Sequence, residues 1–262
     1  LPLMSCSARL PVYALMIGAF IPPVRFFGIV DAQGLTMVVM YFLGTVTALI
    51  LAMIFSRWIK VEGKSTFIME MPPYRVPLMR SVFRQVYLRV KQFVTDAGKI
   101  ILVISVVLWV LASFPKTDNS QNIKTSYAGK IGKVIEPVIR PLGFDWKIGI
   151  SLLTSFAARE VMVSTLATIY NVESDDGNVV KLTDALQQDK NPETGKPAYT
   201  VLTGISIMVF FVFAAQCMAT FAVVRRETNT WKWPLFMIFY MTGLAYVMSF
   251  IVYQGGLLIG VG

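Results

Sequence analysis

Apolar runs recur along this chain at lengths that suit a lipid bilayer. About 20 apolar residues in a helix span the roughly 30 Å of hydrocarbon in a membrane. Runs of about this length cover residues 10–30, 34–56, 97–114, 146–170, 199–224 and 233–259. The pattern predicts an all-α, polytopic membrane protein, with a single membrane domain over residues 1–262 and five to six transmembrane or re-entrant segments.

Two of these runs contain residues that interrupt a membrane helix. The first carries Pro11 and the pair Pro22 and Pro23, and the run over 146–170 carries a charged pair at its midpoint. Proline removes a helix donor, and backbone freed in this way is tolerated at membrane depth only beside protein or a water-filled cavity. Broken helices therefore indicate a substrate pathway, with a simple kink as the alternative at Pro22 and Pro23.

The connections between the runs differ in charge. Residues 57–99 hold nine Lys or Arg against three acids, which predicts a cytoplasmic loop. Within this loop apolar residues recur every three or four positions, which predicts an amphipathic helix on the membrane surface over residues 77–95. Residues 171–198 are acidic and predict a solvated outer loop, whereas 225–232 are basic and predict an inner one. Both assignments hold if 146–170 is a re-entrant hairpin.

Composition agrees with a membrane location. The chain is 55% apolar and 15% charged, whereas soluble domains are about a quarter charged. The net charge of +9 comes from basic residues in the gaps between apolar runs, so we expect the lipid bilayer and not nucleic acid as the partner. The two cysteines, Cys6 and Cys217, lie beside or within apolar runs and are expected to be free thiols. The chain begins with Leu, so we expect its natural N-terminus to be missing.

Cys6 lies in a stretch that we predict to be extended. Pro11 suits the first turn of a helix and disfavours helical geometry just before it, so residues 5–10 precede a helix start. Carbonyl and hydroxyl oxygens around a thiol there would suit a borderline-soft divalent cation. The alternative is that Cys6 is a small apolar filler and Arg9 an interfacial anchor.

Cys217 lies inside the run over 199–224, before the basic end of that run. Ala215 and Ala219 flank it as a pair of small residues four positions apart, a spacing that lets another helix approach closely. The thiol is therefore a second candidate for the pathway. Packing is the alternative, because a membrane cysteine commonly serves as a small hydrophobe.

Arg159 and Glu160 are the strongest physical indication of function. Ionisable residues near the membrane midplane cost about 2.5–3.5 kcal/mol each on insertion scales, so they are candidates for functional roles. Neighbours in sequence do not face each other on a helix, so we expect the two side chains to have different partners. We expect Glu160 to face the protein interior or an aqueous cavity. The alternative is a pair that stabilises a re-entrant segment.

Several kinds of chemistry are excluded. The chain contains no His, which rules out a two-His-one-carboxylate iron site, a haem His and a Ser-His-Asp triad within it. Gly63, Lys64 and Ser65 resemble the end of a phosphate-binding loop, but Trp58 occupies the position of the required earlier glycine. No enzymatic activity is therefore assigned to this chain.

Four stretches resemble the bacterial ferrous iron permease family, FeoB, over nearly the whole chain. They are residues 1–13 (LPLMSCSARLPVY), 70–75 (EMPPYR), 154–161 (TSFAAREV) and 216–220 (QCMAT), the last followed by 223–228 (VVRRET). The resemblance implies the C-terminal permease, or Gate, portion of a protein that moves Fe²⁺ across the bacterial inner membrane. The family's N-terminal GTPase domain, its linker and its first membrane helices are not in this chain.

The resemblance also implies roles for individual residues. Gate segments of the family carry membrane cysteines, which correspond to Cys6 and Cys217 as metal ligands. The residues expected along the transport pathway are Ser5, Ser7, Arg9, Arg159, Glu160, Gln216 and Met218. Fe²⁺ is expected as transported substrate, with no permanently bound cofactor. The expected partners are the GTPase domain and missing helices of the same protein, and small cytosolic Feo-type accessory proteins.

Two other functions stay open at this point. One is a nucleoside-type solute carrier with the Gate architecture, which would need several hydrogen-bonding side chains around a sugar and base. The other is a membrane assembly subunit that transports nothing, for which loss of the cysteines would not change metal flux.

Overall fold

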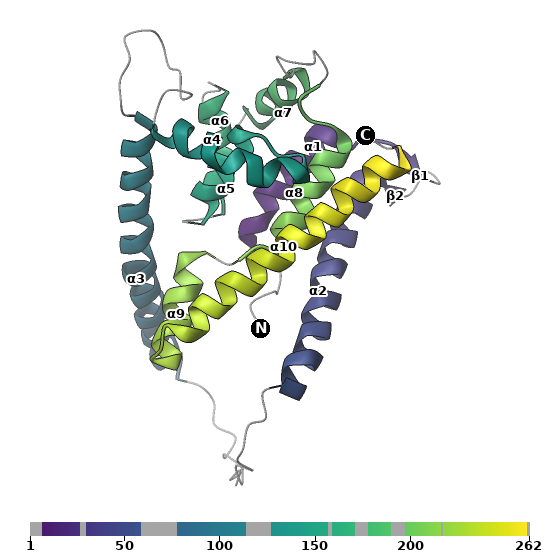
Figure 1. The fold of residues 1–262 in the computed structure, drawn as a ribbon. Helices are drawn as coiled ribbons and strands as arrows, with labels where there is room; N and C mark the ends of the chain where they lie inside the picture. Colours follow the sequence, from purple (N-terminus) through teal and green to yellow (C-terminus); the bar gives the residue numbers. More distant parts are fainter. Residues whose placement is uncertain are drawn as a thin grey trace.

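The computed structural model describes residues 7–26, 30–58, 78–113, 127–156, 159–170, 178–189, 197–215 and 217–260. In these ranges the chain is almost entirely helical (Figure 1). The exception is a pair of short antiparallel strands, β1 (Arg25–Phe26) and β2 (Val30–Asp31). The predicted all-α class is therefore confirmed for the described part of the chain.

The first apolar run forms a shorter helix than predicted. A 3-10 turn, η1 (Ser7–Arg9), leads into α1 (Leu10–Phe20), whose 11 residues are about 16 Å long and too short to cross a bilayer. The helix ends because Ile21 precedes a proline and adopts an extended conformation, as residues before proline tend to do. The remainder of the predicted segment over 10–30 enters the β1–β2 hairpin where it is described.

Two helices in the described ranges are long and apolar enough to cross a membrane. They are α2 (Ala32–Trp58) and α10 (Lys232–Ile259), about 40 Å long each. Their outward faces carry exposed apolar side chains such as Phe42, Met53, Phe239 and Ile251. Apolar faces of this extent are unfavourable in water, whereas lipid chains would cover them. These helices agree with the predicted runs over 34–56 and 233–259.

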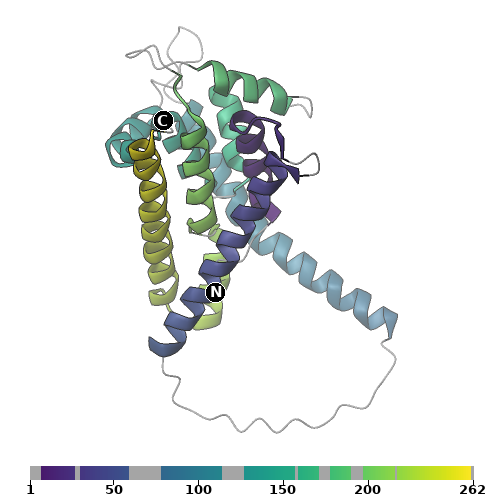
Figure 2. The same ribbon diagram turned by 90° about the vertical axis from the view of Figure 1, so that its right-hand side faces the viewer.

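One helix replaces two predicted elements. The surface helix expected over 77–95 and the span expected over 97–114 form a single helix, α3 (Met79–Ser113), of 35 residues. The side chains change from amphipathic to apolar along α3, but this stretch contains no proline to remove a backbone hydrogen bond, so the helix continues. Figure 2 shows the first half of α3 projecting away from α2 and α10, whereas in Figure 1 it overlaps α9 and the start of α10. Its contact with a membrane surface stays a prediction.

Two helices lie in segments that we predicted to be connections. The first, α4 (Tyr127–Ile139), leads into a 3-10 turn, η3 (Arg140–Leu142). Gly143 then turns the chain with φ of +81°, and a Cβ there would lie 2.2 Å from the ring of Tyr253 on α10. The second, α7 (Asn178–Gln188), lies within the acidic segment predicted as a solvated loop. It packs on α1 because two of its leucines, Leu182 and Leu186, are buried.

The run over 146–170 is a helical hairpin. It consists of α5 (Trp146–Ser155) and α6 (Val161–Ile169), which fold back on each other and share a contact of 2.9 Å between the hydroxyls of Thr154 and Thr165. The segment is therefore a helical hairpin, and its re-entrant position in a membrane stays a prediction.

The run over 199–224 is broken. It forms α8 (Val201–Phe213) and α9 (Met218–Thr228), separated by non-helical backbone. Buried α8 is central to the described fold and packs against α1, α2 and α10. Gly204 permits the approach of α1, since a Cβ there would lie 2.6 Å from the ring of Phe20. On the other side, buried Ser206 and Ser249 join α8 to α10 through hydroxyls 2.7 Å apart.

Candidate functional site

The tip of the α5–α6 hairpin meets the break between α8 and α9. Phe156 ends α5, and its carbonyl accepts a hydrogen bond of 3.2 Å from the backbone N–H of Met218, the first residue of α9. The last turn of one helix and the first turn of another leave backbone groups without partners inside their own helices. This hydrogen bond satisfies one group of each kind and fixes the hairpin tip beside the break.

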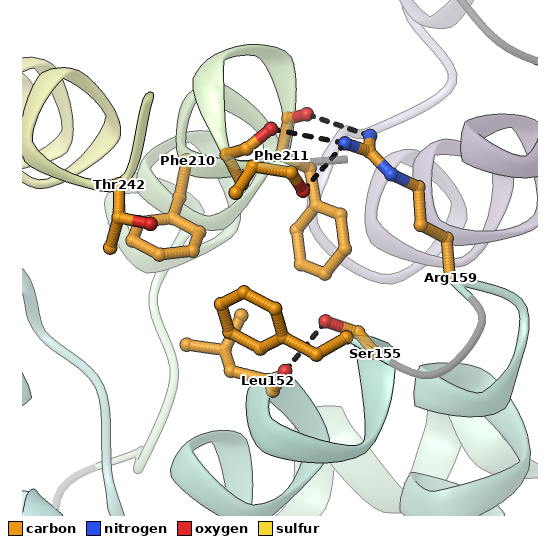
Figure 3. A pocket seen from close by; sticks show the side chains of 9 residues that line it. Leu152, Ser155, Arg159, Phe210, Phe211 and Thr242 are labelled. Atoms are coloured by element: carbon orange, nitrogen blue, oxygen red, sulfur yellow. Dashed lines mark hydrogen bonds between the residues drawn. The ribbon is translucent and has the colours of Figure 1, made fainter. Parts of the chain in front are cut away.

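Arg159 makes the second connection between these segments. It lies beside the hairpin tip and is only 3% exposed. Its guanidinium donates to the carbonyls of Phe211 at 3.3 Å, Ala214 at 3.0 Å and Ala215 at 3.1 Å (Figure 3). We call these three hydrogen bonds the tip contact.

The tip contact is favourable for two physical reasons. Carbonyls at the end of α8 no longer have intrahelical partners, and at membrane depth no bulk water replaces them. The C-terminal end of a helix also carries partial negative charge, which attracts a cation. The five donors of a guanidinium suit several carbonyls at once, whereas a lysine would offer a point charge. Arg159 therefore stabilises the end of α8 and joins it to the hairpin.

A small cavity lies next to the tip contact. Its volume of about 10 Å³ is close to the room that a single water molecule needs. Ser155, Arg159 and Thr242 supply polar side chains to its wall, and phenylalanine and alanine side chains supply most of the rest (Figure 3). A cavity of this size does not hold a nucleoside.

Cys217 occupies the break itself. It is the residue before the first turn of α9, in an extended conformation, and its free thiol is half-buried. The Sγ atom lies 3.7 Å from Oγ1 of Thr220 in the next turn. The structure thus places the soft sulfur donor of Cys217 at non-helical backbone, beside the tip of the α5–α6 hairpin. In the described ranges no three His, Cys, Asp or Glu side chains come together as a ready-made metal site.

The other predicted pathway residues have different settings. Ser5, Cys6 and Gln216 lie outside the described residues. Ser7 begins the turn η1, although its side chain is not described, and Met218 is 40% exposed.

Arg9 is buried at the start of α1, with 1% of its surface exposed, and its guanidinium donates to the hydroxyl of Tyr13. Tyr13 is also within electrostatic range of Arg159. Arg9 therefore contacts Tyr13 directly, whereas Arg159 acts on the same tyrosine only through its charge.

Glu160 differs from its neighbour Arg159. It is the residue before the first turn of α6, makes no side-chain capping hydrogen bond and is exposed on the surface of this chain. Of the two expected settings, the protein interior and an aqueous cavity, the described residues do not place Glu160 in the interior, whereas they bury Arg159. Exposure to an aqueous cavity stays a prediction.

A second polar cluster was missed by the sequence analysis. It lies where the hairpin begins and ends, at the opposite end from the tip contact, and we call it the base network. Asp145 caps α5 by accepting from the N–H of Ile148 at 3.0 Å, and Tyr199 donates to the other Asp145 oxygen at 2.9 Å. Burial raises the pKa of Asp145 above its ordinary value, and the hydrogen bonds from Ile148 and Tyr199 oppose this rise.

The rest of the base network comes from α5 and the residues that follow α6 and α7. Lys147 pairs with Asp189 at 2.5 Å, and Tyr170 lies 2.5 Å from the same Asp189 oxygen. The two phenol oxygens, of Tyr170 and Tyr199, are 3.3 Å apart. An Asp just before an apolar run is a sequence signal for a helix cap, but nothing local indicates its distant partners.

Comparison with protein families assigns the class of the protein. The family model described as "Gate: Nucleoside recognition" matches residues 94–231, more than half of the chain, and the model "Ferrous iron transport protein B C terminus" matches residues 37–89. The first match contains both the hairpin and the broken helix α8–α9. The chain therefore belongs to the Gate family.

Curated relatives make the assignment more specific. The chain is 49% identical, over 99% of its length, to the Fe(2+) transporter FeoB of Leptospira biflexa, and 34% identical over 97% to that of Staphylococcus aureus. It is 36% identical over 98% to an Fe(2+) transport protein A/Fe(2+) transporter FeoB fusion protein of Porphyromonas gingivalis. It is thus similar to the C-terminal membrane portion of FeoB, as predicted.

The coverage of these relatives is partial. The chain spans 38% of the Leptospira biflexa protein, 35% of the Staphylococcus aureus protein and 34% of the fusion protein. No solved structure matches the chain.

Proposed function

We propose that this chain is the permease part of a ferrous iron transporter in the bacterial inner membrane. The similarity to proteins named Fe(2+) transporter over 97–99% of the chain supports this function. In the intact protein, a GTPase domain outside this chain would gate the permease. The relative in which transport protein A is fused to FeoB supports a small Feo-type accessory partner.

The observation that carries the proposal is the position of Cys217 at the break between α8 and α9. Non-helical backbone at membrane depth is found where protein or a water-filled cavity satisfies it, and transporters use such breaks to bind ions. A thiolate and nearby oxygens are donors that Fe²⁺ accepts. Thr220 supplies one such oxygen within 3.7 Å of the sulfur.

Arg159 limits where the iron path runs. Its guanidinium already occupies the carbonyls of Phe211, Ala214 and Ala215, and its buried positive charge repels a divalent cation. We therefore place the path on the Cys217 side of the break, away from the small cavity. In this proposal Arg159 and Arg9 are positioning residues that hold α8 and α1.

The remaining predicted residues complete the proposed pathway. In sequence, Cys6 lies just before the turn η1 that leads into α1, and Cys217 lies just before α9, which supports a second thiol ligand near the start of a short helix. Gln216 and Met218 flank Cys217 in sequence, and Ser5 and Ser7 flank Cys6, so each thiol has neighbours with oxygen or sulfur donors. Glu160 would attract Fe²⁺ from an aqueous cavity.

The proposed membrane arrangement follows from the helices. Two of them, α2 and α10, cross the bilayer, and the α5–α6 hairpin enters and leaves on one side. The apolar half of α3 and the broken helix α8–α9 supply further crossings, so five segments enter the membrane, and the short helix α1 makes a sixth if it enters as well. The acidic segment containing α7 lies outside.

The test is uptake of Fe²⁺ by proteoliposomes that contain the intact transporter. Serine keeps the size of cysteine but exchanges a soft donor for a hard one, so Cys6→Ser should reduce uptake severalfold at limiting iron, with a milder loss in Cys217→Ser. Thr220→Ser, which keeps the hydroxyl, is the matched control. Wild-type uptake by both cysteine variants would contradict the ligand role and would favour an assembly subunit.

A nucleoside carrier is the second candidate, because the matched family is described by nucleoside recognition. Nucleoside uptake by the same proteoliposomes decides between the two. Saturable uptake of a nucleoside, with no uptake of Fe²⁺, would replace the iron proposal.

A further inference from the structure

The base network contains a continuous chain of four side-chain oxygens. Asp145 Oδ2 lies 2.9 Å from the hydroxyl of Tyr199, which lies 3.3 Å from that of Tyr170, which in turn lies 2.5 Å from Asp189 Oδ2. The chain starts before α5, passes residues at the start of α8 and the end of α6, and finishes after α7. It has no part in the proposed iron path.

When both aspartates are ionised, this chain of oxygens has one hydrogen too few for its three contacts. Each phenol carries a single hydrogen, so two hydrogens serve three oxygen–oxygen contacts while both aspartates are ionised. Tyr199 then donates to Asp145 and Tyr170 to Asp189, and no hydrogen remains between the two phenols. The two phenol oxygens are nevertheless within hydrogen-bond distance, at 3.3 Å, so this contact is where an additional hydrogen would be used.

One added proton completes the chain. A protonated carboxyl can donate to a phenol, which frees that phenol to donate to the next one. Protonated Asp145 would donate to Tyr199, Tyr199 to Tyr170, and Tyr170 to Asp189. Tyr170 would also accept from Lys147, whose Nζ atom is 3.2 Å away, so both lone pairs of its oxygen are used.

The environment favours Asp145 over Asp189 as the carrier of the proton. Asp189 pairs with Lys147 at 2.5 Å, which stabilises its ionised form. Within the described residues Asp145 has no such ion pair. Its Oδ1 accepts from the N–H of Ile148, and a neutral acid keeps that acceptor while Oδ2 donates. Burial independently raises the pKa of Asp145.

We infer that the base network is a proton-binding site, in which a neutral carboxyl group at Asp145 begins a directed hydrogen-bond chain through Tyr199 and Tyr170 to Asp189. The bound proton strengthens the connection between the start of α5, the end of α6 and the start of α8. Loss of the proton removes the central bond of the chain and loosens the base of the hairpin.

The titratable groups that face Asp145 among the described residues all belong to this network. Lys147 is on α5, Asp189 follows α7 and Tyr199 precedes α8, and Tyr170 after α6 completes the chain. Lys147 opposes protonation of Asp145 and Asp189 favours it. Two effects therefore hold the proton, burial of Asp145 and the hydrogen bonds of the two phenols. Substitution of a phenol measures the second effect separately from the first.

Infrared difference spectroscopy of the intact transporter tests the site directly, because a protonated carboxyl group has a carbonyl stretch distinct from that of a carboxylate. Because the pKa of Asp145 is raised, we expect wild type to keep such a band at pH values above about 3.9, the ordinary pKa of aspartate. Asp145→Asn should lack the band, whereas Asp189→Asn should keep it. A spectrum of Asp145→Asn identical to wild type, or loss of the band only in Asp189→Asn, would overturn the assignment.

Tyr170→Phe separates the chain from burial alone. When Asp145 is protonated, Tyr199 donates to the hydroxyl of Tyr170, and this hydrogen bond is absent when Asp145 is ionised. Tyr170→Phe removes that acceptor, so it weakens the protonated state relative to the ionised state. Proton affinity should fall by roughly threefold to tenfold, as expected for one net hydrogen bond. An unchanged titration midpoint of the carboxyl band in Tyr170→Phe would mean that the phenol chain does not hold the proton.

Discussion

The two ends of the α5–α6 hairpin are held in different ways. At the tip, one buried guanidinium serves three backbone carbonyls at the end of α8. At the base, two carboxyl groups, two phenols and an ammonium share the connection. At the tip a single side chain makes these contacts beside one backbone hydrogen bond, from Met218 to Phe156, whereas the base distributes its interactions over five side chains.

The difference shows how each end is adapted to its surroundings. At the tip, carbonyls freed by the break between α8 and α9 need donors, and a carboxylate there would bring only further acceptors. At the base, the side chains of Lys147 and Asp189 are 17% and 19% exposed. Water therefore reaches these groups and helps to solvate both positive and negative charge. We therefore expect the tip to be sensitive to single substitutions and insensitive to pH, and the base to show the reverse.

Arg159→Met should cause the largest loss of stability. Methionine fills part of the volume but leaves the carbonyls of Phe211, Ala214 and Ala215 without their donor, which we expect to cost about 2–4 kcal/mol. Thermal unfolding in detergent measures the effect. Arg159→Lys is the matched control, because it keeps the charge without the fork of donors and should be intermediate. A stability of Arg159→Met equal to wild type would show that the tip contact is not needed.

Asp189→Asn should cause a smaller loss at the base. It removes the charge that pairs with Lys147 while keeping an oxygen for Tyr170, so we expect about 1–2 kcal/mol in the same measurement. The loss should diminish at high salt, because the pair is partly exposed. A loss as large as that of Arg159→Met would mean that the base is no more tolerant than the tip.

The pH dependence of stability should come from the base. The folded-state pKa of Asp145 is raised above its unfolded value, so the folded protein binds more protons between the two values. This contribution to stability is present at the acidic end of that window and is lost as the pH rises through the folded pKa. Asp145→Asn should remove that slope, while Arg159→Lys should keep it. An unaltered slope in Asp145→Asn would assign the dependence to another group.

Glu160→Gln should have the smallest effect on stability, within about 0.5 kcal/mol, because the side chain is exposed and makes no capping hydrogen bond. Its effect on uptake is the informative measurement. A folded Glu160→Gln transporter that loses Fe²⁺ uptake would support a transient cation site. Retained uptake would remove Glu160 from the proposed pathway.

Hydrophobic patterning predicted the long elements well. Helices α2 and α10 begin and end close to the predicted limits because a long apolar helix satisfies its own backbone and needs no partner to specify it. The pattern was less informative where the chain breaks. It gave one segment over 10–30 and one over 199–224, whereas α1 ends at Phe20 and the other run divides into α8 and α9.

The sequence by itself determined the helical class, the candidate thiols and the special character of Arg159, because composition, periodicity and insertion cost are properties of local sequence. Only the tertiary structure decided that Arg159 turns inward to carbonyls more than 50 positions away, and that Glu160 turns outward. The same holds for the base network, in which Asp145 and Tyr199 are 54 positions apart. Such contacts follow from how helices pack, and no local pattern of residues encodes which distant oxygen a buried side chain will meet.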